Sequence, residues 1–379
     1  MPSITLQSLL QQHFPRFSKT HSIPVYQHKT IRHLMDCRTA KLGGHTQYCE
    51  NGHVNGVWYN SCKDRSCPQC KGIRSERWLL KTDSVLLRCP HHHIIFTLPH
   101  ELNSLWVFNR VLMADILFRA VQETLNQLSR DKRYLNAKPG YMCALHTWGR
   151  NLSLHPHLHC LITHGGLARD NTWREPKKKC LFPRKVVMMI FRGKINAYIK
   201  EAIAQESFKI PPSETPQRII NLCNRLGRKE WVVHFCKRYD HGKGVASYLA
   251  KYVRGGPLKN GQLQSVGANR IRFSYTSHQS KKSESIIFSA ADFIKRWLNH
   301  IPVPKKRTVR SYSLYNPRAR DALNIARLLH KQKEVSEPEQ LAWQDYLDNI
   351  EKPIKCSVCG AGLYHGKEQG GTITEKLVA

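Results

Sequence analysis

Long hydrophobic runs and acidic residues are both scarce in this sequence. No stretch of the 379 residues approaches the roughly 18 consecutive apolar positions of a membrane-spanning helix. The N-terminal segment MPSITLQSLLQQHFPRF also lacks the charged stretch and apolar run of a signal peptide. We therefore expect a cytoplasmic protein. Hydrophobic residues still make up 41% of the chain, which excludes a disordered tail and allows an ample core.

The shortage of acidic residues leaves a large positive charge. Lys and Arg number 60 against 27 Asp and Glu, which gives a formal net charge of +33. Such a chain repels itself unless an anion is bound, and nucleic acid is the favoured partner. A generally basic surface, or an affinity for acidic lipids, is the alternative.

The cysteines do not suggest a disulfide framework. Their number, 13, is odd, they are concentrated near the ends of the chain, and several stand at metal-ligand spacing. Reduced thiols and bound zinc fit this pattern better.

Composition divides the chain into three expected domains: a Cys- and His-rich zinc-binding and DNA-binding domain over 1–85, a catalytic domain over 86–300, and a basic C-terminal region with a C-x-x-C tail over 301–379. The first has few long apolar stretches, so a metal is expected to replace much of its core.

In the catalytic domain we predict one long helix over 104–131 and another over 184–204. Strands over 141–149 and 157–164 are joined by a loop too short for a crossover helix, so they should pair antiparallel. The predicted class is α+β, with a largely antiparallel sheet.

The stretch CENGHVNGVWYNSCKDRSCPQCKG, residues 49–72, has the spacing of a structural zinc site. Cys67 and Cys70 form a C-x-x-C knuckle, and either Cys49 with His53 or Cys49 with Cys62 can complete a tetrahedron. Buried free thiols in an ordinary small domain are the alternative.

Further candidate ligands flank this stretch. Cys37 and His45 lie just upstream, which brings the candidates to seven and permits a second zinc. Near the C-terminus, Cys356 and Cys359 form an isolated C-x-x-C with only His365 nearby, either a further zinc site or a fortuitous pair. We expect the N-terminal module to be structural and to grip DNA through four basic side chains, Lys63, Arg65, Lys71 and Arg74.

The stretch LHPHLHCLITHGG, residues 154–166, places histidines at alternate positions of a predicted strand. His157 and His159 project from one face, while Pro156 marks the strand's start and leaves His155 less certainly aligned. Two imidazoles make half a metal site, and a satisfied pair of surface or core histidines is the alternative. His146 on the partner strand can supply a third ligand if the register places it opposite, and His93 is the other candidate. Such a site suits Mg or Mn as readily as zinc when phosphate oxygens fill the remaining positions.

The segment HGKGVASYLAKYVRGGP, residues 241–257, reads as a helix of about three turns between glycines. Tyr248 and Tyr252 are four residues apart and share a face. Lys251 flanks that face, where it could contact a phosphate or favour phenolate. Core packing of two tyrosines at helical spacing is the alternative.

Together these features resemble the HUH superfamily of single-strand DNA nucleases, in particular the two-tyrosine rolling-circle transposases of the insertion-sequence-ninety-one type. The resemblance rests on ordered blocks: CRTAKLGGH, YNSCKDRSCPQC, IIFTLPHEL, LHTWGRNLSLHPHLHCLITHGG, SYLAKYVRGGP and HIPVPKKRTVRSYSLY. It implies an HUH nuclease-like sheet flanked by helices, metal-binding His157 and His159, nucleophilic Tyr248 and Tyr252, and structural zinc at the N-terminal cysteines. His146 as third ligand comes from the hairpin geometry instead.

The resemblance implies DNA transposition by single-strand cleavage and strand transfer through 5′-phosphotyrosine intermediates, with Mg or Mn as the catalytic metal. The partner would be single-stranded or melted DNA at transposon ends and target, in the bacterial cytoplasm at the nucleoid. A plasmid-type replication initiator or relaxase would use the same histidines and tyrosines. A non-catalytic zinc-containing DNA-binding regulator, or a zinc hydrolase, would form no covalent DNA adduct.

Overall fold

The computed structural model describes residues 4–70, 72–176, 180–236, 238–241, 244, 246–247, 256–277, 280–341 and 355–369. The chain forms two compact units, and each is assembled from separated segments. Unit 1 contains Met1–Trp78, Arg254–Ile301 and Glu339–Ala379, whereas unit 2 contains Leu79–Val253 and Pro302–Pro338. The division into three functional domains stays a prediction.

A five-stranded sheet forms the centre of unit 2, and all of its strand pairs are antiparallel. The expected α+β class with an antiparallel sheet is therefore confirmed. The order is β12-β4-β5-β3-β8, with bounds Val309–Ser313, Gly140–Trp148, Leu154–Thr163, His91–Thr97 and Val233–Phe235. The first of these, β12, was not expected from the basic sequence around it.

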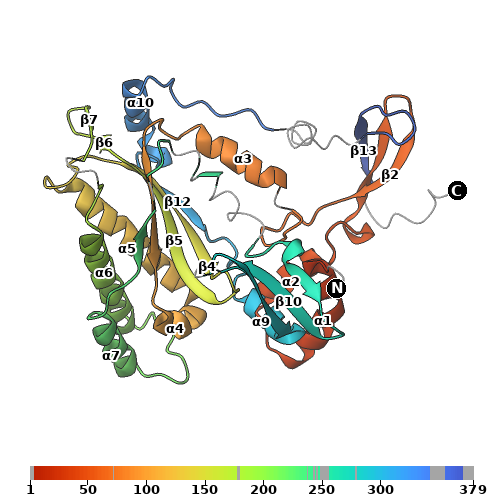
Figure 1. The fold of residues 1–379 in the computed structure, drawn as a ribbon, viewed down its shortest axis with the longest axis horizontal. Helices are drawn as coiled ribbons and strands as arrows, with labels where there is room; N and C mark the ends of the chain where they lie inside the picture. Colours follow the sequence, from red (N-terminus) through yellow and green to blue (C-terminus); the bar gives the residue numbers. More distant parts are fainter. Residues whose placement is uncertain are drawn as a thin grey trace. The chain divides into compact units, whose positions relative to one another are not determined.

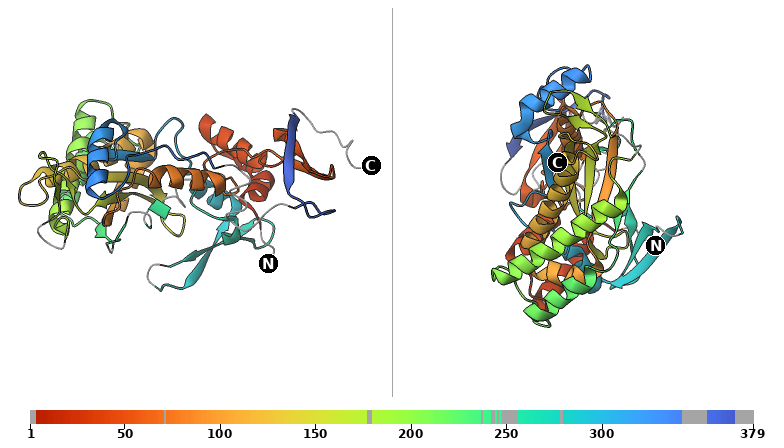
Figure 2. Two further views of the ribbon diagram at one scale, coloured as in Figure 1. Left: turned by 90° about the horizontal axis from the view of Figure 1, so that it is seen from above. Right: turned by 90° about the vertical axis from the view of Figure 1, so that its left-hand side faces the viewer.

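One face of this sheet carries the core of unit 2. Ile94 and Phe96 on β3 and Leu158 and Cys160 on β5 are all fully buried in one hydrophobic cluster. They pack with helices α5 (Arg110–Arg130), α6 (Arg184–Ala204) and α7 (Pro216–Leu226), which lie next to one another in Figures 1 and 2. Because side chains alternate along a strand, the odd-numbered histidines of β3 and β5 project from the opposite face.

The helix expected over 104–131 is two helices, α4 (Asn103–Phe108) and α5, and this correction has a local cause. Asn109 between them adopts non-helical backbone angles. Its side chain accepts a hydrogen bond from the Lys209 amide at 2.8 Å and donates to the Lys209 carbonyl at 2.8 Å. A buried amide that binds a distant loop therefore interrupts an otherwise continuous apolar pattern. The helix expected over 184–204 has these bounds in the structure.

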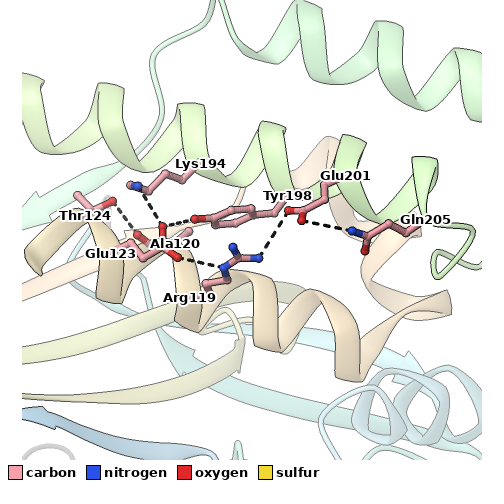
Figure 3. A network of polar contacts seen from close by, with 8 residues as sticks. All are labelled: Arg119, Ala120, Glu123, Thr124, Lys194, Tyr198, Glu201 and Gln205. Atoms are coloured by element: carbon pink, nitrogen blue, oxygen red, sulfur yellow. Dashed lines mark hydrogen bonds and ion pairs between the residues drawn. The ribbon is translucent and has the colours of Figure 1, made fainter. Parts of the chain in front are cut away.

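A polar network of partly exposed side chains joins α5 to α6 (Figure 3). Glu123 accepts hydrogen bonds from Arg119 at 3.0 Å, from Lys194 at 3.1 Å and from the Tyr198 hydroxyl. The Arg119 guanidinium also lies over the Tyr198 ring, 4.0 Å from its centroid. These partly exposed contacts add to the apolar packing between the two helices.

The remaining described elements of unit 2 are short. They are η2 (His100–Leu102), β6 (Gly166–Leu167), β7 (Trp173–Arg174), η4 (Pro317–Ala319) and α10 (Arg320–Leu329). Helix α3 (Gly72–Asp83) contains the point at which the chain passes from unit 1 to unit 2.

Unit 1 has more helix and more core than the sequence led us to expect. Helix α1 (Leu6–Thr20) begins with a capping box between Thr5 and Ser8, and α2 is Val25–Met35. Helix α1 contacts α9 (Ala290–Leu298), and the Gln27 side chain of α2 donates to the Leu298 carbonyl at 2.9 Å. Metal was expected to replace much of the core of the N-terminal region, but helix α1 also buries an apolar face: Leu6, Leu9, Leu10, Phe14 and Phe17.

Two small antiparallel sheets complete unit 1. One has the order β11-β10-β9, with bounds Ser283–Ser289, Arg270–Thr276 and Leu263–Ser265; the other has the order β13-β1-β2, with bounds Leu363–Gln369, Gly44–Cys49 and Val54–Tyr59. Short 3-10 turns lie at Ala40–Leu42 and Asn260–Gln262. Within the residues that the structure describes, no helix combines the length and apolarity needed to cross a membrane.

Candidate metal centres

Three histidines from adjacent strands of unit 2 meet on the face opposite the core. The β4–β5 register places His146 directly opposite His157, as the hairpin prediction required, and His159 lies two residues further along β5. The Nε2 atoms of His157 and His159 are 3.0 Å apart. One ring nitrogen from each of the three residues lies within 4.8 Å of the others, so their arrangement can hold a metal ion.

The environment keeps these imidazoles neutral. His146, His157 and His159 are 3%, 8% and 3% exposed. Burial lowers the pKa of His157 to about 4 and also lowers the pKa of His146 and of His159. Each ring therefore offers a lone pair at neutral pH, which is the form that binds metal.

Hydrogen bonds orient the rings. The Nδ1 atom of His157 lies 2.6 Å from the His155 carbonyl, which can only accept, so this nitrogen carries the proton and Nε2 carries the lone pair. The Nδ1 atom of His159 forms a hydrogen bond of 2.7 Å with the Nε2 atom of His93. His93 thus contacts a candidate ligand from behind and is not in the three-histidine group, whereas His146 is in it; His146 as the third ligand stays a prediction. Such outer partners commonly fix the orientation of metal-binding histidines.

The spacing does not identify the ion. The 3.0 Å between the His157 and His159 nitrogens is also the length of a hydrogen bond between the two rings. Imidazole nitrogen binds zinc as well as other divalent metals, so the choice of Mg or Mn stays a prediction.

The expected nucleophiles cannot be compared with this geometry. Tyr248, Lys251 and Tyr252 lie outside the described residues, and so does Lys71. Their roles stay predictions.

Four cysteines of unit 1 form a second group. The sulfur atoms of Cys37, Cys62, Cys67 and Cys70 all lie within 4.8 Å of one another. The Sγ atom of Cys37 is 3.4 Å from that of Cys70 and 3.8 Å from that of Cys67, and the Cys62 and Cys70 Sγ atoms are 3.6 Å apart. Tetrahedral zinc separates its sulfur ligands by about 3.8 Å. Hydrogen bonds within the group lower the pKa of Cys70 and raise the pKa of Cys62 and of Cys67, so without metal the four thiols share their protons.

The composition of this group corrects the sequence interpretation. Cys49 and His53 do not complete the C-x-x-C knuckle, because the cysteine from the end of α2, Cys37, takes that place together with Cys62. Cys49 and His53 instead group with Cys356 and Cys359, the pair that had no neighbour in the sequence other than His365. His45 belongs to neither group among the described residues. All 13 cysteines are free thiols.

Basic side chains flank the four-cysteine group. Lys63 is exposed and has a left-handed backbone, with φ of 55°. Arg65 is half-buried, and Arg74 donates to the Lys63 carbonyl. Their contact with DNA stays a prediction.

Comparison with known proteins identifies the family. Residues 140–322 match the family described as "Putative transposase", and residues 9–98 match the family described as "Transposase zinc-binding domain". A "Putative transposase y4qJ" of Sinorhizobium fredii is 29% identical over 90% of this chain and 89% of its own length. The "Transposase for insertion sequence element IS801" of Pseudomonas savastanoi pv. phaseolicola is 27% identical over 92% of this chain and 85% of its own. No solved structure matches.

The chain is therefore a transposase by family. It belongs to the IS91-type insertion-sequence transposases and carries their N-terminal zinc-binding domain. The three-histidine group lies within the segment matched by the transposase family, and the four-cysteine group lies within the zinc-binding segment.

Proposed function

We propose that this transposase cleaves and rejoins single-stranded DNA by rolling-circle transposition, through 5′-phosphotyrosine intermediates. The observation that carries the proposal is the convergence of three buried, neutral histidines on one point of the sheet. Three neutral imidazoles at this separation can bind one divalent cation through their lone pairs.

His146, His157 and His159 would hold Mg or Mn, which supplies Lewis-acid stabilisation of charge on a phosphate oxygen. His93 and the His155 carbonyl would keep the two rings of β5 in the orientation that binding needs. The basic surface would hold the DNA backbone, so affinity should fall steeply with salt.

Tyr248 or Tyr252 would act as the nucleophile. The phenolic oxygen forms a bond to the scissile phosphorus as the bond from phosphorus to the 3′ oxygen breaks, and the 3′ oxygen takes up a proton. The phenolic proton leaves to solvent or to a nearby base, and Lys251 would favour the phenolate. The phosphotyrosine retains the energy of the broken bond, so rejoining needs no nucleotide triphosphate. Two tyrosines allow one to hold a donor end while the other cleaves a second strand.

The experiment incubates purified protein with single-stranded oligonucleotides from the ends of the element, in Mn or Mg, and measures a protein–DNA species that survives denaturation. We expect this adduct in the parent, and its loss in Tyr248→Phe/Tyr252→Phe and in His157→Ala. Tyr48→Phe/Tyr239→Phe is the matched control that should retain it, since neither residue belongs to the three-histidine group. An adduct of undiminished yield in the double-Phe protein would refute the proposal.

The same assay addresses the alternatives. A DNA-binding regulator or a hydrolase would give no adduct. A replication initiator or relaxase would give the adduct, but would not join a donor end to an unrelated target strand. The family match favours strand transfer, and a location at the bacterial nucleoid remains part of this proposal.

A further inference from the structure

The turn between β1 and β2 presents half of a metal site. Cys49 ends β1, and His53 follows the turn four residues later. The Cys49 amide donates to the His53 carbonyl at 3.1 Å, and the Gly52 amide donates to the Cys49 carbonyl at 3.0 Å. Gly52 has φ of 76°, a conformation that glycine adopts without strain. This closed turn places the Cys49 sulfur 3.4 Å from His53 Nδ1.

The segment near the C-terminus presents the other half. Between Cys356 and Cys359 the chain folds into a tight turn, in which the Gly360 amide donates to the Cys356 carbonyl at 2.9 Å. The Cys356 amide returns to the Ala361 carbonyl at 2.8 Å. The Val358 amide points at the Cys356 sulfur at 3.4 Å, an amide-to-sulfur contact that stabilises a thiolate. The turn thus has the form of a zinc knuckle.

Independent contacts bring the two halves together within unit 1. Strand β13 pairs with β1 so that Leu363 lies opposite Cys49, and Figure 1 shows β13 in the same small sheet as β2. The Asn55 side chain accepts hydrogen bonds from the Ser357 amide at 3.1 Å and from its hydroxyl at 2.7 Å. Asn51 donates to the Cys359 sulfur at 3.4 Å.

The resulting distances are those of a coordination shell. The Cys49 and Cys359 sulfurs are 3.7 Å apart, and a tetrahedral zinc site separates two sulfurs by about 3.8 Å and a sulfur from a nitrogen by about 3.6 Å. A disulfide would require about 2.05 Å. One atom from each of the four residues lies within 4.8 Å of the others.

We propose that Cys49, His53, Cys356 and Cys359 form a second structural zinc site, which fastens the C-terminal segment to the β1–β2 hairpin. Among the residues that the structure describes, the hydrophobic cluster at this place consists of Cys49, Cys356 and Leu363, with Ala361 against it. So small a core contributes little free energy to holding a strand from the far end of the sequence, and metal binding would add to it. The matched zinc-binding segment ends at residue 98, so it contains only half of these ligands.

The zinc content of the full-length chain tests this site. The measurement does not involve DNA cleavage, so the second zinc site and the proposed function can fail independently of each other. The test uses a His157→Ala background, which removes a ligand of the three-histidine group, so that this group does not add to the zinc count. After dialysis against a weak chelator, we expect two zinc ions per chain in this parent and one when Cys356→Ser/Cys359→Ser is added. The control Cys180→Ser/Cys236→Ser removes two thiols outside all three groups and should retain both ions. One zinc in the parent, or two in Cys356→Ser/Cys359→Ser, would overturn the site.

Cobalt substitution guards against a variant that merely misfolds. Thiolate-to-cobalt absorption reports sulfur ligands and does not respond to the three-histidine group. The parent should show one site with four sulfurs and one with three sulfurs and a nitrogen. His53→Cys should keep both ions and convert the second spectrum to the four-sulfur form. A parent spectrum with the four-sulfur site alone would contradict the proposal even if every variant misfolded.

Discussion

The cysteine groups of unit 1 and the histidine group of unit 2 are built on different supports. The histidines project from long, hydrogen-bonded strands whose other face belongs to a large core, so their positions are set before any ion arrives. The cysteines lie on turns and strand ends, and within the described part of the chain the Cys49 group adjoins a cluster of three buried residues. We therefore expect unit 2 to fold without metal and then to bind it. Around β1 and β2 we expect folding to depend on bound metal.

Removal of zinc should give the largest effect. A structural zinc contributes on the order of 10 kcal/mol to the folding of a small site. A strong chelator should therefore abolish the hydrogen-exchange protection of β1, β2 and β13, while β4 and β5 keep theirs. Exchange followed by mass spectrometry measures both regions in one sample. Unchanged protection of β1 in zinc-free protein would show that the metal is not what holds this sheet.

Leu158→Ala should weaken unit 2 without touching the zinc content. Leu158 is fully buried between the two β5 histidines but faces the opposite side of the sheet, so truncation leaves a cavity in the main core. We expect a loss of about 2–5 kcal/mol in the free energy of unfolding by urea. Zinc per chain should equal that of the parent, and a fall in zinc would mean that the two regions are not independent.

Acid should destabilise unit 2 through its buried histidines. His91 bonds to the Cys89 carbonyl and the Tyr315 hydroxyl, both at 2.7 Å, and burial lowers its pKa from 6.5 to about 4. The unfolded chain binds more protons than the folded chain between these values. Stability is thus complete above pH about 6.5 and falls as the pH drops towards 4, by up to about 3 kcal/mol for this residue.

The comparison of parent and His91→Gln isolates this contribution. The variant should be less stable at pH 7 because the hydrogen bonds are disturbed, but its stability should decline less steeply between pH 6.5 and 4. Urea titrations at several pH values in saturating zinc give both slopes. Equal slopes would assign the acid sensitivity to other groups.

Glu123→Gln should give the smallest effect. Glu123 joins Arg119, Lys194 and Tyr198 on the outer side of α5 and α6, but its side chain is 37% exposed, so water screens the charges (Figure 3). We expect a loss of about 1 kcal/mol or less in the free energy of unfolding, measured in low salt. A loss as large as that of Leu158→Ala would mean that polar contacts, not the core, hold α6 in place.

The sequence pattern predicted those features of the fold that depend on residues close together in the chain. The alternation of His157 and His159, the hairpin that brings His146 opposite, and the helix over 184–204 follow from side-chain period and loop length. The interruption between α4 and α5 at Asn109 was not predicted, because Asn109 bonds to Lys209, which is 100 residues away in the sequence. Strand β12 was missed because its basic, half-buried sequence gives a weak strand signal, and its pairing with β4 supplies the hydrogen bonds.

The sequence by itself determined the ligand types and the half-sites: a knuckle at Cys67 and Cys70, a turn at Cys49 and His53, and a pair at Cys356 and Cys359. Only the tertiary structure decided which halves combine. Four ligands close a tetrahedron only when their atoms come within a few ångströms, and that depends on the pairing of β1 with β13, which joins positions about 310 residues apart. Spacing along a chain records local geometry, whereas the partner of each half-site is set by long-range contacts.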